Sequence, residues 1–261
     1  MGRTTLRGTA TLLGVAAAII LGASGAFAAS APVISVGIST VGIYDNYNVS
    51  MPGTANPDGT YSLSGVGYGN DFNCDWSITA NTDPSISGSF NLQNLSATAQ
   101  TFVLTVSLPT SIAGPTKMGG TVGDVTYTDT GGPGGTTPAF RDSTVTIMTV
   151  TGASFYQAMI DGSSVGPIGA LGMYPSPGLT AFGGPGASGT FSQLAFGTPI
   201  PNAAGPAVTS SIGIRVTFNL TAGDSTSIPV FFEVEKAPEP ASLALVGLGV
   251  AAVAIARKRS A

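Results

Sequence analysis

The sequence predicts an all-β fold, an antiparallel β-sandwich with jelly-roll-like connections, over residues 29–236. Apolar and polar residues alternate along several short segments, and such alternation gives a strand one buried side and one solvent-facing side. Turn-forming residues, among them Asn56-Pro57-Asp58-Gly59 and the glycine-rich residues 131–135, separate these segments. Roughly ten short strands separated by such turns favour a two-sheet sandwich.

The clearest strand candidates carry large apolar residues at every second position. They are residues 102–108, 212–220 and 228–234, and the shorter candidates are 33–38, 75–80, 87–92, 122–128, 143–150 and 190–196. Residues 153–159 fit either a brief helix or the end of a strand. Residues 161–189 hold nine glycines and four prolines, with several large apolar residues between them. This composition predicts a long loop lying partly on the sandwich, and the alternative is a disordered insertion.

A secretory signal peptide is predicted over residues 1–28, as an N-terminal helix that precedes the sandwich. Arg3 and Arg7 precede an apolar run, and Ala26-Phe27-Ala28 matches the small-x-small pattern of a signal-peptidase site. We therefore expect the Sec translocon and signal peptidase as partners. An uncleaved N-terminal anchor is the alternative, and it leaves the spacing of Ala26 and Ala28 unexplained.

The predicted exported segment is acidic and weakly charged. Residues 29–236 contain twelve Asp or Glu and four Lys or Arg, which gives a net charge near −8. Such a segment lacks the cations that neutralise phosphates, so we expect no nucleic-acid partner.

The chain contains no histidine. This excludes Ser-His-Asp triads, Cys-His nucleophiles and the usual zinc sites. Ser164 lies in a G-x-S-x-G pattern, but it has no histidine to activate it and no strand-then-helix context. No two acidic residues stand out by their spacing as a pair for glycoside hydrolysis. We therefore expect no catalytic residue, no cofactor and no enzymatic activity.

Asp71, Asn73 and Asp75 place three oxygen-bearing side chains at alternate positions. This spacing resembles the first half of a calcium loop, but Trp76 and Thr82 stand where the glycine and the bidentate glutamate should be. A solvated loop beside a buried tryptophan is the favoured interpretation, so no metal site is assigned. Calcium binding is the alternative.

Two other residue types leave alternatives open. The only cysteine, Cys74, is expected to be buried as a small apolar residue, and an intermolecular disulfide is the alternative. Exposed tyrosines would offer a platform for sugar rings, whereas buried ones pack in the core or fill turns. The candidates are Tyr44, Tyr47, Tyr61 and Tyr68.

The C-terminal residues 237–261 combine three features. They are the triplet Pro238-Glu239-Pro240, the apolar run 241–256 and the basic tip Arg257-Lys258-Arg259. A helix over the apolar run is about 24 Å long, which falls short of a hydrocarbon core of about 30 Å. We expect a marginal transmembrane helix, with the basic tip on the cytoplasmic side and the sandwich outside.

This order of triplet, short Ala/Leu/Gly-rich helix and basic tip resembles the PEP-CTERM sorting signal of Gram-negative bacteria. The resemblance implies recognition by exosortase, a polytopic membrane protease or transpeptidase, with Pro238, Glu239, Pro240 and the basic tip as the sorting residues. Weaker similarities to segments common in PEP-CTERM proteins extend inward. They include Asn94, Met159-Ile160-Asp161-Gly162 and the run from Leu220 to Ser225.

These features together predict an exported protein that is transiently anchored in the inner membrane before it reaches the cell surface or the extracellular space. We expect a structural or adhesive role in the extracellular matrix of a biofilm rich in exopolysaccharide. The alternative is a carbohydrate-binding module for the producer's own exopolysaccharide.

Overall fold

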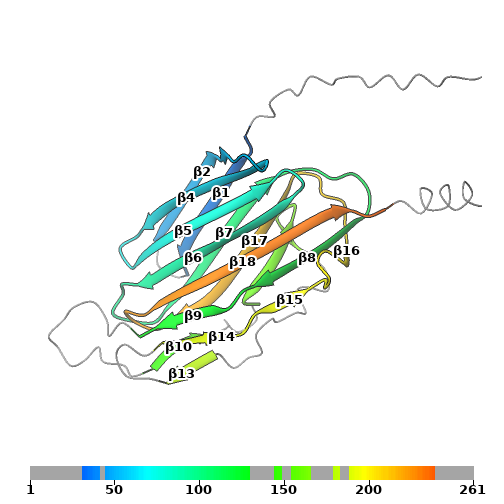
Figure 1. Ribbon diagram of the computed structural model, residues 1–261. Helices are drawn as coiled ribbons and strands as arrows, with labels where there is room; N and C mark the ends of the chain where they lie inside the picture. Colours follow the sequence, from blue (N-terminus) through cyan, green and yellow to red (C-terminus); the bar gives the residue numbers. More distant parts are fainter. Residues whose placement is uncertain are drawn as a thin grey trace, which may run out of the picture. The chain divides into compact units, whose positions relative to one another are not determined.

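The computed structural model describes residues 31–41, 45–129, 144–148, 154–165, 179–182 and 188–238 (Figure 1). These residues form strands and connecting turns that belong to one compact unit. Every pairing between the described strands is antiparallel. The predicted all-β, antiparallel fold is therefore confirmed for this part of the chain. The jelly-roll-like connections stay a prediction, and the flanking helices predicted for residues 1–28 and 241–256 lie outside the described residues.

One sheet has eight strands in the order β12-β11-β17-β7-β1-β2, with β10 paired to β17 and β13 paired to β10. Its strands are β1 (Val33–Thr40), β2 (Asn46–Pro52), β7 (Gln100–Pro109), β10 (Thr144–Met148), β11 (Tyr156–Ile160), β12 (Ser163–Ser164), β13 (Leu179–Phe182) and β17 (Ser211–Leu220).

The other sheet has ten strands in the order β14-β9-β18-β6-β5-β4-β3, with β8 beside β18 and with β15 and β16 beside β8. Its strands are β3 (Thr54–Ala55), β4 (Thr60–Tyr68), β5 (Phe72–Asn81), β6 (Ser85–Asn94), β8 (Thr116–Val122), β9 (Val125–Thr128), β14 (Ser188–Phe191), β15 (Leu194–Phe196), β16 (Ala203–Gly205) and β18 (Ser225–Lys236).

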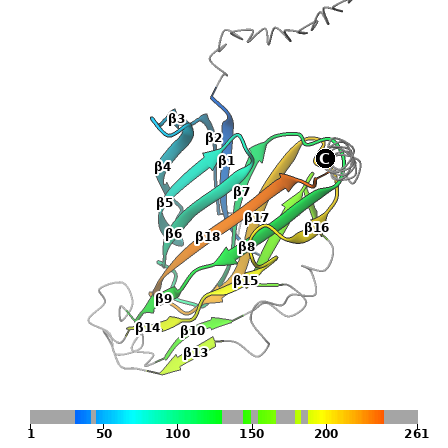
Figure 2. The same cartoon turned by 45° about the vertical axis from the view of Figure 1, so that its right-hand side comes forward.

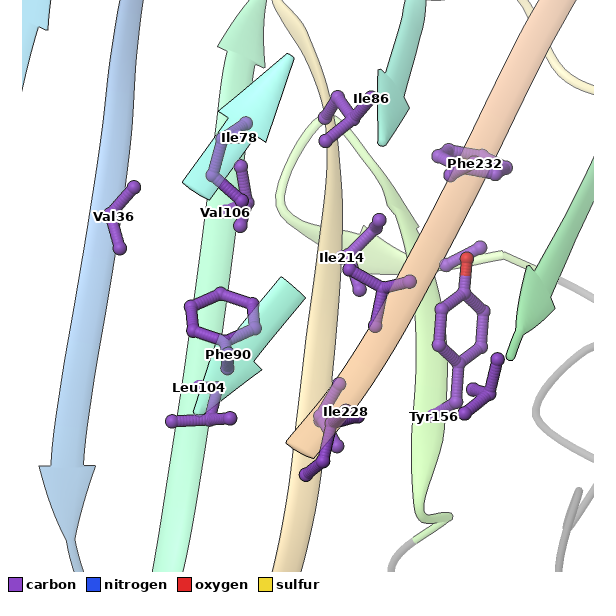
Figure 3. Close-up of a cluster of buried hydrophobic side chains, with 14 of the residues drawn as sticks. Val36, Ile78, Ile86, Phe90, Leu104, Val106, Tyr156, Ile214, Ile228 and Phe232 are labelled. Carbon is purple, nitrogen blue, oxygen red and sulfur yellow. The ribbon is translucent and has the colours of Figure 1, made fainter. Parts of the chain in front are cut away.

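The two sheets share one hydrophobic core. In both views β5, β6 and β18 of the larger sheet lie over β7 and β17 of the other (Figures 1 and 2). The alternating apolar residues that predict β7, β17 and β18 are all buried, as expected. Figure 3 shows side chains of both sheets in the same space, with Leu104 and Ile214 from one and Phe90 and Phe232 from the other. Burial of these two apolar faces is the main force that holds the sheets together.

Tyr156 joins the two sheets within this core. It is fully buried on β11, and its hydroxyl donates a hydrogen bond of 2.8 Å to the carbonyl oxygen of Phe231 on β18. Burial raises the pKa of Tyr156, so the phenol stays protonated and remains a donor. Gly120 on β8 makes room for it, because a Cβ there would lie 2.7 Å from the tyrosine hydroxyl oxygen.

Several elements differ in detail from the predicted ones. Residues 122–128 divide into the end of β8 and the whole of β9, with Gly123 and Asp124 between them. Residues 153–159 contribute to strand β11, as one of the two interpretations expected. The glycine-rich region 161–189 contains β12 and β13, and β13 extends the eight-stranded sheet through β10.

Strand β4 gave no clear signal, because Gly65 and Gly67 interrupt its alternation. Both glycines lie where another residue approaches closely. A Cβ at Gly65 would lie 2.6 Å from the indole ring of Trp76, and one at Gly67 would lie 2.7 Å from the side chain of Ile38. A glycine inside a strand often marks such a close approach.

Asp161 ties the turn between β11 and β12 to the start of β17. It adopts a φ of 51°, followed by Gly162 at 75°. Its carboxylate accepts backbone hydrogen bonds from Thr209, Ser210 and Ser211, the shortest of them 2.7 Å. The hydroxyls of Thr209 and Ser210 also donate to it. These bonds, the one from the Thr209 N–H foremost, hold the pKa of Asp161 below its ordinary value of 3.8.

We expect Asp161→Asn to lower the melting temperature at neutral pH, because the amide has one acceptor oxygen for donors that now share two. The folded-state pKa of Asp161 lies below the unfolded value, so its stabilisation is present above pH 3.8 and is lost as the pH falls through the folded pKa. The difference between the wild type and the variant should therefore shrink below that pH.

Thermal melts over a pH series measure this difference. Asp75→Asn is the matched control, because the Asp75 carboxylate accepts no hydrogen bond within the described part of the chain. A difference that stays constant down to the lowest pH at which the protein folds would contradict the assignment.

Candidate functional site

The predicted sorting triplet begins where the last strand ends. Lys236 is the final residue of β18 and pairs with Thr116 on β8. The Ala237 N–H then donates a hydrogen bond of 3.0 Å to the carbonyl oxygen of Pro115. Pro238 follows and is exposed. The chain therefore leaves the sheet at the first residue of the triplet.

The other predicted processing residues lie outside the described residues. They are Glu239, Pro240, Arg257, Lys258 and Arg259 of the sorting signal, and Ala26 and Ala28 of the signal-peptide site. In the part of the chain that the structure describes, no helix has the length and apolar character needed to cross a membrane.

Strand β5 carries most of the segment that the spacing of Asp71, Asn73 and Asp75 singled out. Asn73 and Asp75 point outward from this strand, whereas Asp71 lies in the preceding turn, where its N–H donates to the Asp45 carboxylate at 2.9 Å. The interpretation as a solvated loop is thus wrong for Asn73 and Asp75, because pairing with β4 and β6 makes them part of a central strand. Among the described residues, no cluster of three His, Cys, Asp or Glu side chains could hold a metal ion.

Cys74 points inward between these two residues and is fully buried, as expected for a small apolar side chain. Burial, together with the nearby charge of Asp75, raises the pKa of the Cys74 thiol to about 12. The thiol therefore stays protonated at neutral pH and is out of reach of a partner sulfur in the folded protein.

A polar groove lies on the outer face of the ten-stranded sheet, where β5, β6, β18 and β9 run side by side (Figure 1). Its volume is about 220 Å³. Amide, carboxylate and hydroxyl groups dominate the outward-facing lining. The groove residues are Asn73, Asp75, Asn91, Gln93, Thr126, Thr128, Ser225 and Ser227. We call this surface the outer polar groove.

The groove residues form two rows across the strands. Asp75 pairs with Asn91, Asn91 with Ser227, and Ser227 with Thr126. The second row runs in the same way from Asn73 through Gln93 and Ser225 to Thr128. Adjacent strands lie about 4.8 Å apart, so each row presents polar groups over roughly 14 Å.

The tyrosine candidates lie in different surroundings. Tyr68 on β4 is 70% exposed and stands opposite Asn73, at the end of the second row. Tyr47 and Tyr61 are partly buried, and Tyr47 packs against the core. Tyr44 lies outside the described residues. Only Tyr68, among the three described candidates, thus offers a largely free ring.

Sequence reasoning singled out Asn73, Asp75 and Tyr68 but not the rest of the groove. Four of the remaining groove residues are polar residues at outward positions of alternating strands, and this pattern is visible in the sequence. They are Asn91, Gln93, Ser225 and Ser227. This signal is also that of any solvated strand face. The pairing register, which the sequence alone does not give, is needed to bring these residues together.

Comparison with known proteins identifies the C-terminal segment. Residues 236–259 match the model of the PEP-CTERM protein-sorting motif, the C-terminal sorting signal of exosortase substrates. No curated protein and no solved structure matches the chain. The matched range begins at the last residue of β18 and includes the Pro-Glu-Pro triplet and the three basic residues.

Proposed function

From the PEP-CTERM protein-sorting motif that the chain carries at residues 236–259, we propose that it serves a structural or adhesive role at the cell surface or in a biofilm matrix. The motif indicates an exported surface protein that passes through a membrane-anchored stage and is processed by exosortase. The proposed route uses the Sec translocon, signal peptidase and transient anchoring in the inner membrane. The role is non-catalytic, in keeping with a chain that contains no histidine.

The position of the motif supports this proposal. The fold continues as a paired strand to Lys236, and the hydrogen bond of Ala237 to Pro115 closes it. Cleavage beyond Ala237 therefore leaves the described strands of both sheets intact. A folded β-rich body that survives release from its anchor suits an extracellular structural or adhesive part.

The intact mass of the native extracellular protein tests the processing route. We expect a mass that begins after Ala28 and ends near Pro238, without Arg257-Lys258-Arg259 and without the apolar run. A protein whose mass includes the basic tip would mean a retained anchor and would refute exosortase release. The same measurement on cells that lack exosortase is the control, and it should give only the unreleased form.

A second candidate function is carbohydrate binding, with the producer's own exopolysaccharide as the ligand. The observation that favours it is the outer polar groove with the exposed Tyr68 at one end. Carbohydrate binding is compatible with the first proposal, because an adhesive matrix protein needs a surface that holds the matrix.

A further inference from the structure

The side chains of the outer polar groove make no hydrogen bonds to the described part of the fold. Within the described part of the chain, none of the eight outward side chains of the outer polar groove makes a hydrogen bond through its own polar group. For Asn73 the missing hydrogen bond is also costly, because its Oδ1 atom is buried and has no partner among the described residues. An unpaired buried acceptor costs about 1–3 kcal/mol, so its presence needs a reason.

Other amides and carboxylates of the protein behave differently. Asn56 donates to the hydroxyls of Thr60 and Ser62, and Asn94 donates to three carbonyl oxygens. The Asp161 carboxylate is fully occupied by the chain around residue 210. Asn56, Asn94 and Asp161 thus hold turns and connections together, whereas the groove side chains make no such hydrogen bond to any described residue.

Several groove residues are also of types that have a low preference for β-strands. Asn and Asp are depleted in strands, where β-branched and aromatic residues are preferred. Asn73, Asp75 and Asn91 nevertheless lie on β5 and β6, two central strands of the ten-stranded sheet. A ligand that uses their polar groups would account for this choice.

The lining chemistry selects the class of ligand. Amide groups donate and accept, hydroxyls do both, and the Asp75 carboxylate accepts. Among the described residues, no lysine or arginine lines the groove, so phosphate and carboxylate groups find no counter-charge there. Many mixed donors and acceptors without a cation match a ligand that is itself a row of neutral hydroxyl groups.

Tyr68 adds a flat apolar surface at the edge of this row. Tyr68 is 70% exposed, and its pairing with Asn73 places the two side chains on the same side of the sheet. Tyrosine combines an apolar ring with a polar end. Such a ring suits the apolar face of a sugar, while the groove suits the sugar's hydroxyl edge.

We propose that the outer polar groove binds a short segment of a neutral polysaccharide, laid across β5, β6, β18 and β9 with one sugar ring on Tyr68. This inference rests on the second candidate function and names its site and ligand class. Chains rich in uronic acid are disfavoured, because Asp75 and the net charge near −8 of residues 29–236 repel them.

A glycan array tests the proposal with the full chain held in detergent. The probes are neutral gluco-, manno-, galacto- and xylo-oligosaccharides, with uronate-containing oligosaccharides beside them. We expect binding to at least one neutral series and weaker binding to the uronates. Asn91→Ala with Gln93→Ala, and separately Tyr68→Ala, should each weaken that binding by about tenfold or more, which corresponds to about 1.4 kcal/mol.

The matched control is Ser77→Ala with Ser89→Ala, which removes polar groups from the same face of β5 and β6 outside the groove. This variant should bind like the wild type, and thermal melts should show all variants folded. Absence of binding to every probe, equal binding by the groove variants, or a preference for uronates would overturn the proposal.

Two further outcomes distinguish direct sugar recognition from calcium-dependent binding and from the sorting route. Binding that disappears with a chelator would overturn direct recognition in favour of a calcium-dependent site at Asp75. Absence of glycan binding by a protein that is still released without its basic tip would refute the groove proposal and leave the sorting proposal standing.

Discussion

We expect Asn94→Asp to destabilise the protein by about 3–5 kcal/mol at neutral pH, the usual cost of leaving an uncompensated charge buried. Asn94 is fully buried at the end of β6. Its side-chain NH₂ group donates to the carbonyl oxygens of Thr98, Leu220 and Thr221 at 2.9–3.0 Å, and its Oδ1 accepts from the N–H of Ser96. A carboxylate in this position would face three acceptors with no proton to offer them.

The penalty should depend on pH in a defined direction. A buried carboxyl among carbonyl oxygens has a folded-state pKa above its unfolded value of about 3.9. The destabilisation is therefore complete above the raised folded pKa and decreases as the pH falls through it, because the protonated acid can donate one hydrogen bond again. Urea unfolding of the variant and the wild type at about pH 7 and about pH 5 measures the change.

Two other variants make the test specific. Asn94→Ala should cost about 2–3 kcal/mol, with a difference from the wild type that does not vary over this pH range. Asn91→Asp places the same charge on the same strand at an exposed position opposite Asp75, and the two like charges should cost only about 1 kcal/mol or less. An Asn94→Asp protein as stable as the wild type at neutral pH would show that the amide donors contribute nothing.

The sequence predicted the strands whose side chains alternate between core and solvent, because burial of one face imposes a period of two. β7, β17 and β18 are the clearest cases, and their buried residues are those expected. β4 was missed because the indole of Trp76 demands a glycine at position 65. A close approach between two strands leaves no periodic signal, so only the folded structure reveals it.

The short segments that resemble parts of PEP-CTERM proteins have structural roles in this fold. Asn94, the turn at Asp161-Gly162 and the connection from Leu220 to Ser225 are places where a side chain holds separate segments together. Thr221, for example, donates its hydroxyl proton to the Asp224 carboxylate in the turn that Asn94 also contacts. These residues therefore hold separate segments of the fold together.

The candidate sites divide in the same way. The sorting triplet was predictable because a linear signal is read in order along the chain, without the fold. The outer polar groove was not, because Asn91 and Ser227 meet Asp75 only through the register of three paired strands. No spacing rule in one sequence relates positions so far apart.

Replacement of Pro238, Glu239 and Pro240 by alanine should strongly reduce release of the protein from the membrane. The resemblance to the sorting signal implies that exosortase recognises this triplet, and the structure leaves its first residue exposed just beyond the sheet. We expect the variant to remain in the membrane fraction with its basic tip, and the released amount to fall by about tenfold or more. Fractionation followed by intact-mass measurement distinguishes the two forms.

Glu235→Ala is the matched control, because it removes an exposed carboxylate near the triplet but inside the paired part of β18. This variant should be released like the wild type.

A second variant, with a short Gly-Ser insertion between Ala237 and Pro238, keeps the triplet and separates it from the strand end, where Ala237 is hydrogen-bonded to Pro115. A protease that binds its substrate as an extended chain needs unpaired residues on both sides of the bond, so the insertion should preserve or accelerate release. Equal release from the triple-alanine variant would mean that recognition depends on the apolar run or the basic tip instead.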